Sequence, residues 1–211
     1  IRTLSLQNSV TFGNKQEAKE SAHRINKLHE VIKGNDEVTG GYYDALDHEQ
    51  LLWVHACLQI SSIYFYEMTV KKLSDDEKNQ YHLENMKAAE LVLVDIEKMP
   101  DTHQELKNWV VNKSQEEGYL VATDVAEDVK NIIGGGPVPR HIKPIWPFIA
   151  FTAFNTLPKE FKEIYGISDS KLKNIVLGLN LKLLKYTRPF LPPFFRLIAP
   201  ARWAQQRITK K

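Results

Sequence analysis

The sequence predicts an all-α protein, a single multi-helix domain over residues 1–211 with bundle-like packing. Apolar side chains recur at three- and four-residue spacing through most of the chain, which is the period of helices that bury one face. Two Ser/Thr-x-x-Glu sequences are typical of helix starts, and we find no pair of alternating segments that predicts a strand hairpin. The 211 residues are 43% hydrophobic and 26% charged, the composition of an ordinary folded protein.

The first predicted helix spans residues 14–33 and ends at Gly34. Residues 34–46 are predicted to form a connecting loop, with Gly40 and Gly41 as its flexible point. The apolar face of this helix carries Ala18, Ala22, Ile25, Leu28, His29 and Ile32.

The second predicted helix begins after Asp47, which can cap it, and ends near Val70. We expect it to pack against the first helix, with His29 and His55 directed into the space between or beside them. Its stripe includes Leu51, Val54, His55, Leu58 and Ser62.

Capping boxes open the next two predicted helices. Residues 74–77 open a third helix that runs to about Lys98, because Pro100 cannot continue it. Residues 102–105 form a second capping box and open a fourth helix.

Shorter helical segments and breaks make up the rest of the chain. A fifth helix is predicted at 121–133, and the Gly- and Pro-rich residues 134–139 form a turn, because they lack the Gly-Lys-Ser/Thr end of a phosphate loop. Further helices are predicted at 144–155, at 158–165 (closed by Gly166) and at 171–186, before a break at Pro189, Pro192 and Pro193 and a last short helical piece.

The charge of the chain is unevenly distributed. Residues 170–211 contain ten Lys and Arg and no Asp or Glu, so all 26 acidic residues lie upstream. A basic, apolar C-terminal segment beside an acidic body predicts docking within the molecule or contact with an anionic surface, including peripheral membrane contact through residues 171–211. No reader motif for nucleic acid accompanies the charge, so we expect no nucleic-acid partner.

A single cysteine excludes an internal disulfide and a cysteine zinc site. Cys57 lies in an apolar run and is predicted to be a buried, inert thiol. The longest stretch without Asp, Glu, Lys, Arg or His, residues 144–158, contains Pro147 and is shorter than the roughly 20 residues of a membrane span. We expect no transmembrane helix and a cytoplasmic or peripheral-membrane location. Because the chain begins at Ile1 and not at Met, we expect that its true N-terminus lies further upstream.

Two histidines, His29 and His55, fall on apolar faces of adjacent predicted helices. A buried imidazole must satisfy its second nitrogen or coordinate a ligand, because burying an unpaired polar group costs a few kcal/mol. Polar side chains gather around these histidines, as a cofactor pocket within a helical bundle requires. They are Arg24 and Lys27, about one turn before His29, and Gln59 and Ser62, which follow His55 along its own face.

Other chemistries have weaker support in the sequence. Glu20 and His23 form a Glu-x-x-His step, but a di-iron site needs a second such step, and none is found. Glu84 has the residue type of a general base. The remaining histidines are expected to be surface or capping groups; these are His23, His48, His82, His103 and His141.

Several short motifs, in this order, resemble a known family. Tyr43-x-Ala45-x-Asp47 is followed by Trp53-Val54-His55-Ala56, and these two motifs are the most specific part of the resemblance. The succession is similar to that of the ER-bound oxygenase mpaB / rubber oxygenase (latex-clearing protein) catalytic domain family. The other matching pieces are residues 24–34, Leu73-Ser74, Tyr81-His82-Leu83-Glu84, Leu157-Pro158 and Tyr165-Gly166, so the resemblance covers most of the chain.

The resemblance implies an all-α fold with further helical sequence upstream of Arg2 and, in the oxygenase branch, a b-type haem that handles dioxygen. By position, His55 would be the proximal iron ligand, and Arg24 and Lys27 would match the basic residues on the distal side. A histidine on an apolar helical face suits a proximal ligand. Leu28 departs from the family pattern, since latex-clearing proteins carry Thr after the distal Lys.

Three functions are therefore open. The first is a haem-dependent oxygenase that acts on an apolar small molecule, isoprenoid- or lipid-like, with iron bound by His55. The second is a non-catalytic helical module that binds a hydrophobic ligand or a membrane surface. The third is an enzyme with a different metal or none, in which His29, His55 and Glu84 act as acid–base groups.

Overall fold

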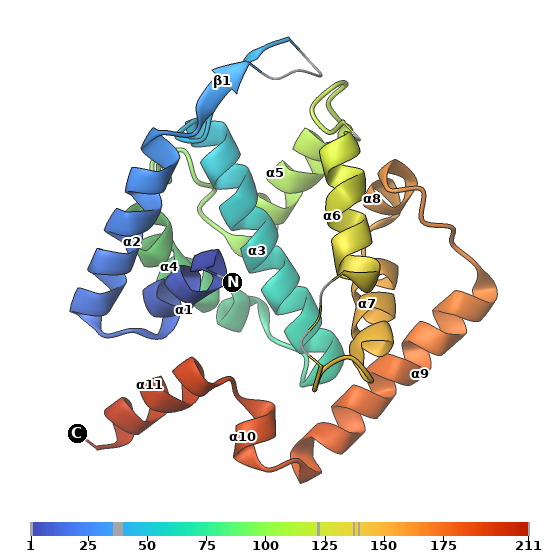
Figure 1. The fold of residues 1–211 in the computed structure, drawn as a ribbon. Helices are drawn as coiled ribbons and strands as arrows, with labels where there is room; N and C mark the ends of the chain where they lie inside the picture. Colours follow the sequence, from blue (N-terminus) through green and yellow to red (C-terminus); the bar gives the residue numbers. More distant parts are fainter. Residues whose placement is uncertain (1, 36–39, 122, 137, 139, 211) are drawn as a thin grey trace. The chain divides into compact units, whose positions relative to one another are not determined.

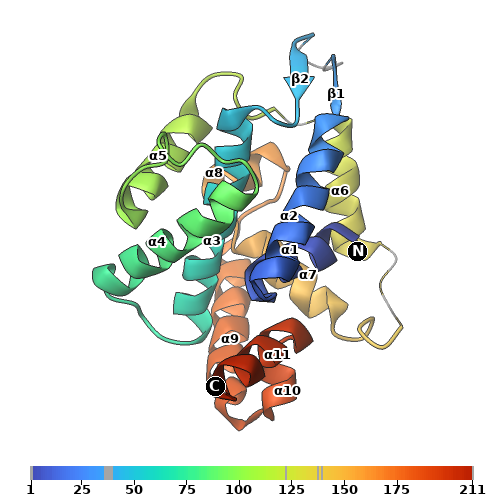
Figure 2. The same ribbon diagram turned by 90° about the vertical axis from the view of Figure 1, so that its left-hand side faces the viewer.

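The computed structural model describes residues 2–35, 40–121, 123–136, 138 and 140–210. Over these ranges the regular secondary structure is helical apart from one small hairpin, which confirms the all-α class (Figures 1 and 2). The strands are β1 (Lys33–Asn35) and β2 (Tyr42–Asp44). The helices are α1 (Arg2–Phe12), α2 (Lys15–Glu30), α3 (His48–Thr69), α4 (Asp75–Leu91), α5 (His103–Gln115), α6 (Asp124–Gly135), α7 (Trp146–Asn155), α8 (Lys159–Ile164), α9 (Lys171–Thr187), the 3-10 turn η1 (Arg188–Phe190), α10 (Pro193–Arg196) and α11 (Ala199–Thr209).

The chain groups into two compact units. The first comprises Ile1–Glu67, Lys71–Val110 and Phe190–Lys211, and the second comprises Met68–Val70 and Val111–Pro189. The basic segment 170–211 is therefore divided, with α9 in the second unit and α10 and α11 in the first. That residues 1–211 form one domain stays a prediction.

Side chains that cap the helices explain where several of them begin. The Asn14 side chain accepts from the backbone N–H groups of Gln16 and Glu17 at 2.9 and 3.0 Å, and Glu17 accepts in return from the Asn14 N–H. The predicted boxes at Ser74 and Thr102 are both present, at the starts of α4 and α5. Each box satisfies N–H groups that have no partner within the helix.

The end of α4 differs from the prediction, which continued this helix to about Lys98. The helix ends at Leu91 because Leu93 adopts φ +64°, in the left-handed region. The Val94 N–H donates to the Ala89 carbonyl at 3.0 Å, and the Leu93 N–H donates to Glu90 at 3.2 Å. This is a Schellman termination without the usual glycine, so the residue types do not indicate it.

The β1–β2 hairpin was not predicted. Lys33, at the start of β1, was predicted to end the first helix, whereas α2 ends at Glu30; the other strand residues were predicted as loop, and both predictions were wrong here. The strands are antiparallel, with Lys33 opposite Asp44, and these two side chains form an ion pair at 3.1 Å. Each strand has three residues and almost no buried side chain, so no alternating pattern marks it. Gly40 has φ +69°, and residues 36–39 lie outside the described part.

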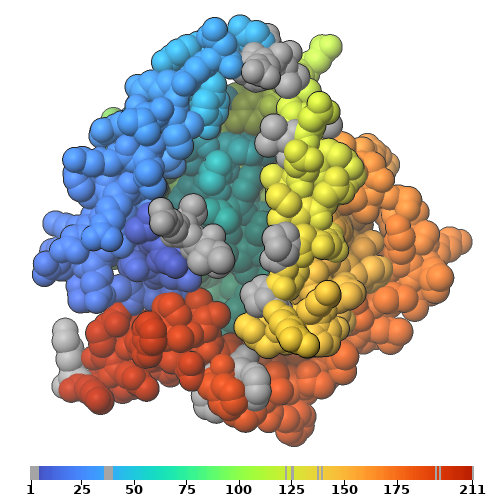
Figure 3. Space-filling model, viewed as in Figure 1, coloured from blue at the N-terminus to red at the C-terminus, as the bar shows by residue number. Residues whose placement is uncertain are grey.

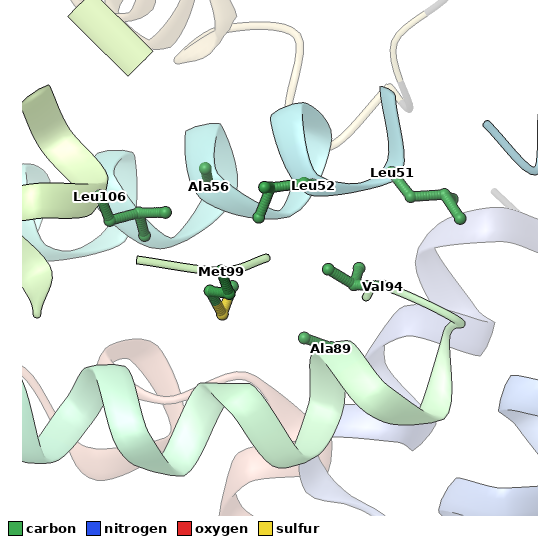
Figure 4. Packing of buried hydrophobic residues seen from close by; sticks show 7 residues of the cluster. All are labelled: Leu51, Leu52, Ala56, Ala89, Val94, Met99 and Leu106. Atoms are coloured by element: carbon green, nitrogen blue, oxygen red, sulfur yellow. The ribbon is translucent and has the colours of Figure 1, made fainter. Parts of the chain in front are cut away.

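The apolar core of the first unit lies between α3, α4, α5 and the segment that follows α4 (Figure 4). Leu106 and Ala56 are fully buried, and Met99 enters from the segment between α4 and α5. Trp53 and Trp109 contact each other beside it, with ring centroids 6.2 Å apart. The core cluster consists of Leu51, Leu52, Ala56, Ala89, Val94, Met99 and Leu106.

The closest backbone neighbour of α2 is α1, and the two helices lie side by side on one face of the first unit (Figure 3). The sequence predicted α3 as this neighbour. The contact of α2 with α4 includes a hydrogen bond of 3.0 Å from the Asn26 side chain to the Leu91 carbonyl. As a result, α1, α3 and α4 together can enclose a space that α2 does not line.

In the second unit, α7 packs against α6 and α9. The Trp146 indole N–H donates to the Ile133 carbonyl at 2.9 Å, and the Lys130 ammonium donates to the Tyr165 carbonyl at 3.1 Å. Gly166, with φ +61°, follows α8 as predicted. The predicted break at 134–139 begins inside α6, and residues 137 and 139 lie outside the description.

No helix among the described residues is long and apolar enough to cross a membrane.

The left-handed conformation at Leu93 yields a test of the α4 termination. Glycine adopts this conformation without steric cost, and Leu93 is 44% exposed, so Leu93→Gly should raise the free energy of unfolding by about 0.5–1 kcal/mol. The matched control is Leu83→Gly, at an exposed position inside α4, which should lower it by about 1 kcal/mol. Urea unfolding measures both. Equal destabilisation by the two variants would contradict this assignment.

Candidate functional site

The first unit contains a pocket of about 550 Å³ whose walls come from α1, α3 and α4. On α3 its polar lining residues are His55, Gln59 and Ser62, spaced four and three residues apart, which places them on one face of the helix. On α4, Tyr81 and Glu84 face the same space with the same helical spacing. The pocket has the size and the mixed lining of a small-molecule site.

His55 stands in this wall with an unsatisfied ring nitrogen. Its Nε2 atom is buried and has no hydrogen-bond partner among the described residues. Desolvation by burial, with a smaller contribution from repulsion by His82, lowers the pKa of His55 to about 4. At neutral pH the ring is therefore uncharged. An unpartnered buried polar atom costs about 1–3 kcal/mol, which a bound ligand could recover.

Gln59 occupies a position that an apolar residue would normally take. It continues the buried stripe of α3 formed by Leu52, Ala56 and Ile63, and it is only 2% exposed. Its Nε2 atom lies 2.8 Å from His82 Nδ1, while its Oε1 atom is buried without a partner among the described residues. The amide nitrogen of Gln59 is thus hydrogen-bonded in the interior, while the amide oxygen is an unused acceptor.

His82 is completely buried, which corrects the expectation that it is a surface or capping group. Its Nε2 atom lies 2.8 Å from the Pro100 carbonyl oxygen. A carbonyl can only accept, so His82 donates through Nε2, and in the neutral ring Nδ1 then accepts from the Gln59 amide. The signal in the sequence is the spacing of His82, Met86 and Ala89, which places His82 on the core face of α4.

His103 is also buried, at 7% exposed, contrary to the same expectation. Its backbone N–H donates to the Asn79 side chain at 3.1 Å, which ties the start of α5 to α4. Burial, followed by the nearby Lys78 charge, lowers the pKa of His103. The remaining three, His23, His48 and His141, are exposed as expected.

The other predicted site residues are not brought together at the pocket. Glu84 is in its lining and accepts a hydrogen bond from the Gln80 amide at 2.9 Å. Arg24 and Lys27 are exposed on α2 and are not in the pocket lining. His29 is half-buried, with Nδ1 unpartnered among the described residues, but it does not line the pocket either.

A conventional multi-residue metal site does not occur in the described part of the chain, since no three His, Cys, Asp or Glu side chains cluster there. A haem iron needs only one axial side chain, because the macrocycle supplies the other ligands, so this observation leaves His55 suitable for it. Cys57 is half-buried rather than fully buried as predicted. Burial raises the pKa of its thiol to about 11, so the thiol is protonated at neutral pH, in agreement with the inert role that we predicted.

Comparison with known proteins gives one informative result. Neither the curated proteins nor the solved structures contain a significant match to this chain. The family model described as "ER-bound oxygenase mpaB/B'/Rubber oxygenase, catalytic domain" matches residues 1–188 of the 211, a range that includes α1, α3 and α4 and so every wall of the pocket. The resemblance inferred from the short motifs is thereby confirmed, and the chain belongs to the mpaB/rubber oxygenase catalytic domain family.

Proposed function

We propose that this protein is a haem-dependent oxygenase that binds b-type haem in the pocket between α1, α3 and α4, with His55 Nε2 as the proximal iron ligand. The observation that carries the proposal is the buried, unpartnered Nε2 atom in the wall of the pocket. An iron ligand must offer a lone pair, and the lowered pKa of His55 keeps the ring uncharged at neutral pH. When bound, the haem supplies the dioxygen chemistry.

The rest of the pocket suggests how the protein treats an apolar substrate. Apolar surface in the pocket that His55 lines comes from Val10 and Phe12 on α1, Leu58 on α3 and Leu91 on α4. Such surface excludes water and favours an isoprenoid- or lipid-like molecule over a polar one. We propose Glu84 as the group that accepts a proton from the bound molecule, because its carboxylate lines the pocket and stays accessible.

The catalytic roles of three residues rest on other grounds. The resemblance alone assigns Arg24 and Lys27 to the distal side of the haem. His29 enters as an acid–base candidate because its half-buried ring has an unpartnered Nδ1 atom. If Lys27 lies on the distal side, as the resemblance implies, Lys27→Ala should preserve haem binding and change the haem spectrum. An unchanged spectrum would agree instead with its exposed position on α2, outside the pocket lining.

His55→Ala should abolish haem binding while the helical fold survives, because the axial bond is lost but packing is not. The measurement is the Soret absorbance of protein expressed with haem supply, together with far-ultraviolet circular dichroism. His23→Ala, which removes an exposed histidine of α2, is the matched control and should keep the Soret band. Wild-type protein that stays colourless would overturn the oxygenase proposal and favour a helical module that binds an apolar ligand without haem.

The neutral state of His55 can be tested without haem. Its pKa of about 4 in the folded protein lies below the unfolded value near 6.5, so the unfolded state binds more protons between these values. The stability that this shift contributes is present above pH 6.5 and is lost as the pH falls toward 4. Across this range, haem-free wild type should lose on the order of 2–3 kcal/mol more unfolding free energy than His55→Ala. Parallel pH profiles would contradict a buried neutral His55.

A second proposal concerns α9, for which an exposed apolar face is the specific observation. We propose that this face rests on an anionic lipid surface. The helix α9 packs against α7 (Figure 1), and Leu181 is its buried residue, but the face of the helix opposite Leu181 is exposed. The exposed face consists of Leu172, Ile175, Val176, Leu179, Leu183 and Tyr186, at helical spacing.

Charge indicates which surface this face fits. Lys171 and Lys182 are exposed along one edge of the stripe, and neither forms an ion pair with the described residues. No acidic residue occurs between residues 170 and 211. An apolar stripe bordered by lysines is typical of helices that lie in the headgroup region of anionic membranes.

Vesicle co-sedimentation tests the α9 proposal. Wild type should sediment with phosphatidylserine-containing vesicles and should be released from them by high salt, which screens the charges. With neutral phosphatidylcholine vesicles, the protein should remain in the supernatant. Leu179→Glu should lose binding, whereas Val31→Glu, an equal charge change at an exposed residue after α2, should retain it. Equal binding to both vesicle types, or concentration-dependent dimerisation that Leu179→Glu abolishes, would refute it.

A further inference from the structure

We propose that Gln59 is a positioning residue for His55: His82 fixes the Gln59 amide so that its Oε1 atom accepts a hydrogen bond from the ring N–H of His55 when His55 Nε2 is bound to iron. The inference rests on the proposed function, because the position of the His55 proton depends on which nitrogen is ligated. It goes further by assigning roles to two buried residues, Gln59 and His82, that the pocket alone does not explain.

The orientation of the Gln59 amide follows from the Pro100 carbonyl. This carbonyl accepts from His82 Nε2 at 2.8 Å, so the neutral His82 ring offers Nδ1 as an acceptor. The Gln59 atom 2.8 Å from Nδ1 must then be the amide nitrogen, which donates. The Oε1 atom of Gln59 is therefore the end of the amide that points away from His82. Atomic positions alone do not distinguish the oxygen of an amide from its nitrogen, but this hydrogen bond does.

The Oε1 atom of Gln59 is left as a buried acceptor with no partner among the described residues. Two polar side chains of α3 share the pocket with it, His55 one turn earlier and Ser62 three residues later. The Ser62 hydroxyl already donates to the Leu58 carbonyl at 2.8 Å. His55 forms no hydrogen bond with the described residues, and its Nε2 atom is buried and unpartnered among them. It is therefore the α3 neighbour with a proton to offer.

Iron binding would determine which His55 nitrogen carries that proton. In the structure the Gln59 amide and the His55 ring are not hydrogen-bonded to each other, and each has one buried unpartnered atom. A metal on Nε2 leaves the neutral ring with its proton on Nδ1, which needs an acceptor. A backbone carbonyl or carboxylate often takes this role beside metal-bound histidines, and we assign it here to the amide oxygen of Gln59.

The expected effect is on the iron, and stability alone would not reproduce it. An acceptor on the ring N–H makes a histidine a stronger donor to its metal, which favours the ferric state. In haem-loaded protein, Gln59→Leu should raise the reduction potential and increase haem dissociation by about 10–100-fold. Ser61→Ala changes an exposed residue of α3 that does not line the pocket, so it should leave both quantities unchanged.

A double-mutant cycle separates positioning from a structural role. His82→Leu releases the Gln59 amide and should shift the potential in the same direction as Gln59→Leu. Because His82 acts on the haem only through Gln59, adding His82→Leu to Gln59→Leu should produce no further shift. Additive shifts, or wild-type values in Gln59→Leu, would overturn the inference even when wild type has a normal Soret band. A wild type without a Soret band would overturn the proposed function itself, and this inference with it.

Discussion

Two hydrogen bonds organise the interior of the first unit: Gln59 donates to His82, and His82 donates to the Pro100 carbonyl, each across 2.8 Å. They join α3, α4 and the segment before α5 in a region from which water is excluded. Buried polar groups of this kind are costly unless they are paired, so the three parts must meet in one register. The contact therefore fixes the rotation of α3 about its axis. With Gln59 turned toward His82, His55 faces the adjoining pocket.

Two neighbouring faces of α3 have different roles: one packs in the apolar core, and the other lines the pocket. The stripe with Leu52 and Ala56 meets Met99 and Leu106 in the apolar core, whereas His55 and Ser62 follow the adjacent stripe along the pocket. Gln59 is buried like the residues of the core stripe, but it also lines the pocket, and its Oε1 atom is an acceptor without a partner among the described residues. This arrangement lets the rigid core hold the pocket wall in place, as a ligand site requires.

Local rules predicted much of this structure from the sequence. The capping boxes at Ser74 and Thr102, the stop at Gly166 and the face shared by His55, Gln59 and Ser62 all depend on spacing within one helix. The end of α4 at Leu93 and the hairpin of two three-residue strands were missed, because neither carries the residue types that usually mark it. The burial of His82 was missed although its spacing with Met86 and Ala89 marks the core face of α4, because its polar partner, Gln59, lies 23 residues away. The pairing of α2 with α1 was missed because no helix was predicted at residues 2–12.

The most direct test of this account is anomalous diffraction at the iron edge from crystals of the haem-loaded protein. The account predicts one iron peak in the pocket between α1, α3 and α4, within bonding distance of His55 Nε2, with the Gln59 amide oxygen turned toward the other nitrogen of the ring. An iron peak beside His29 or any other side chain, or a haem in this pocket without a bond to His55, would contradict it.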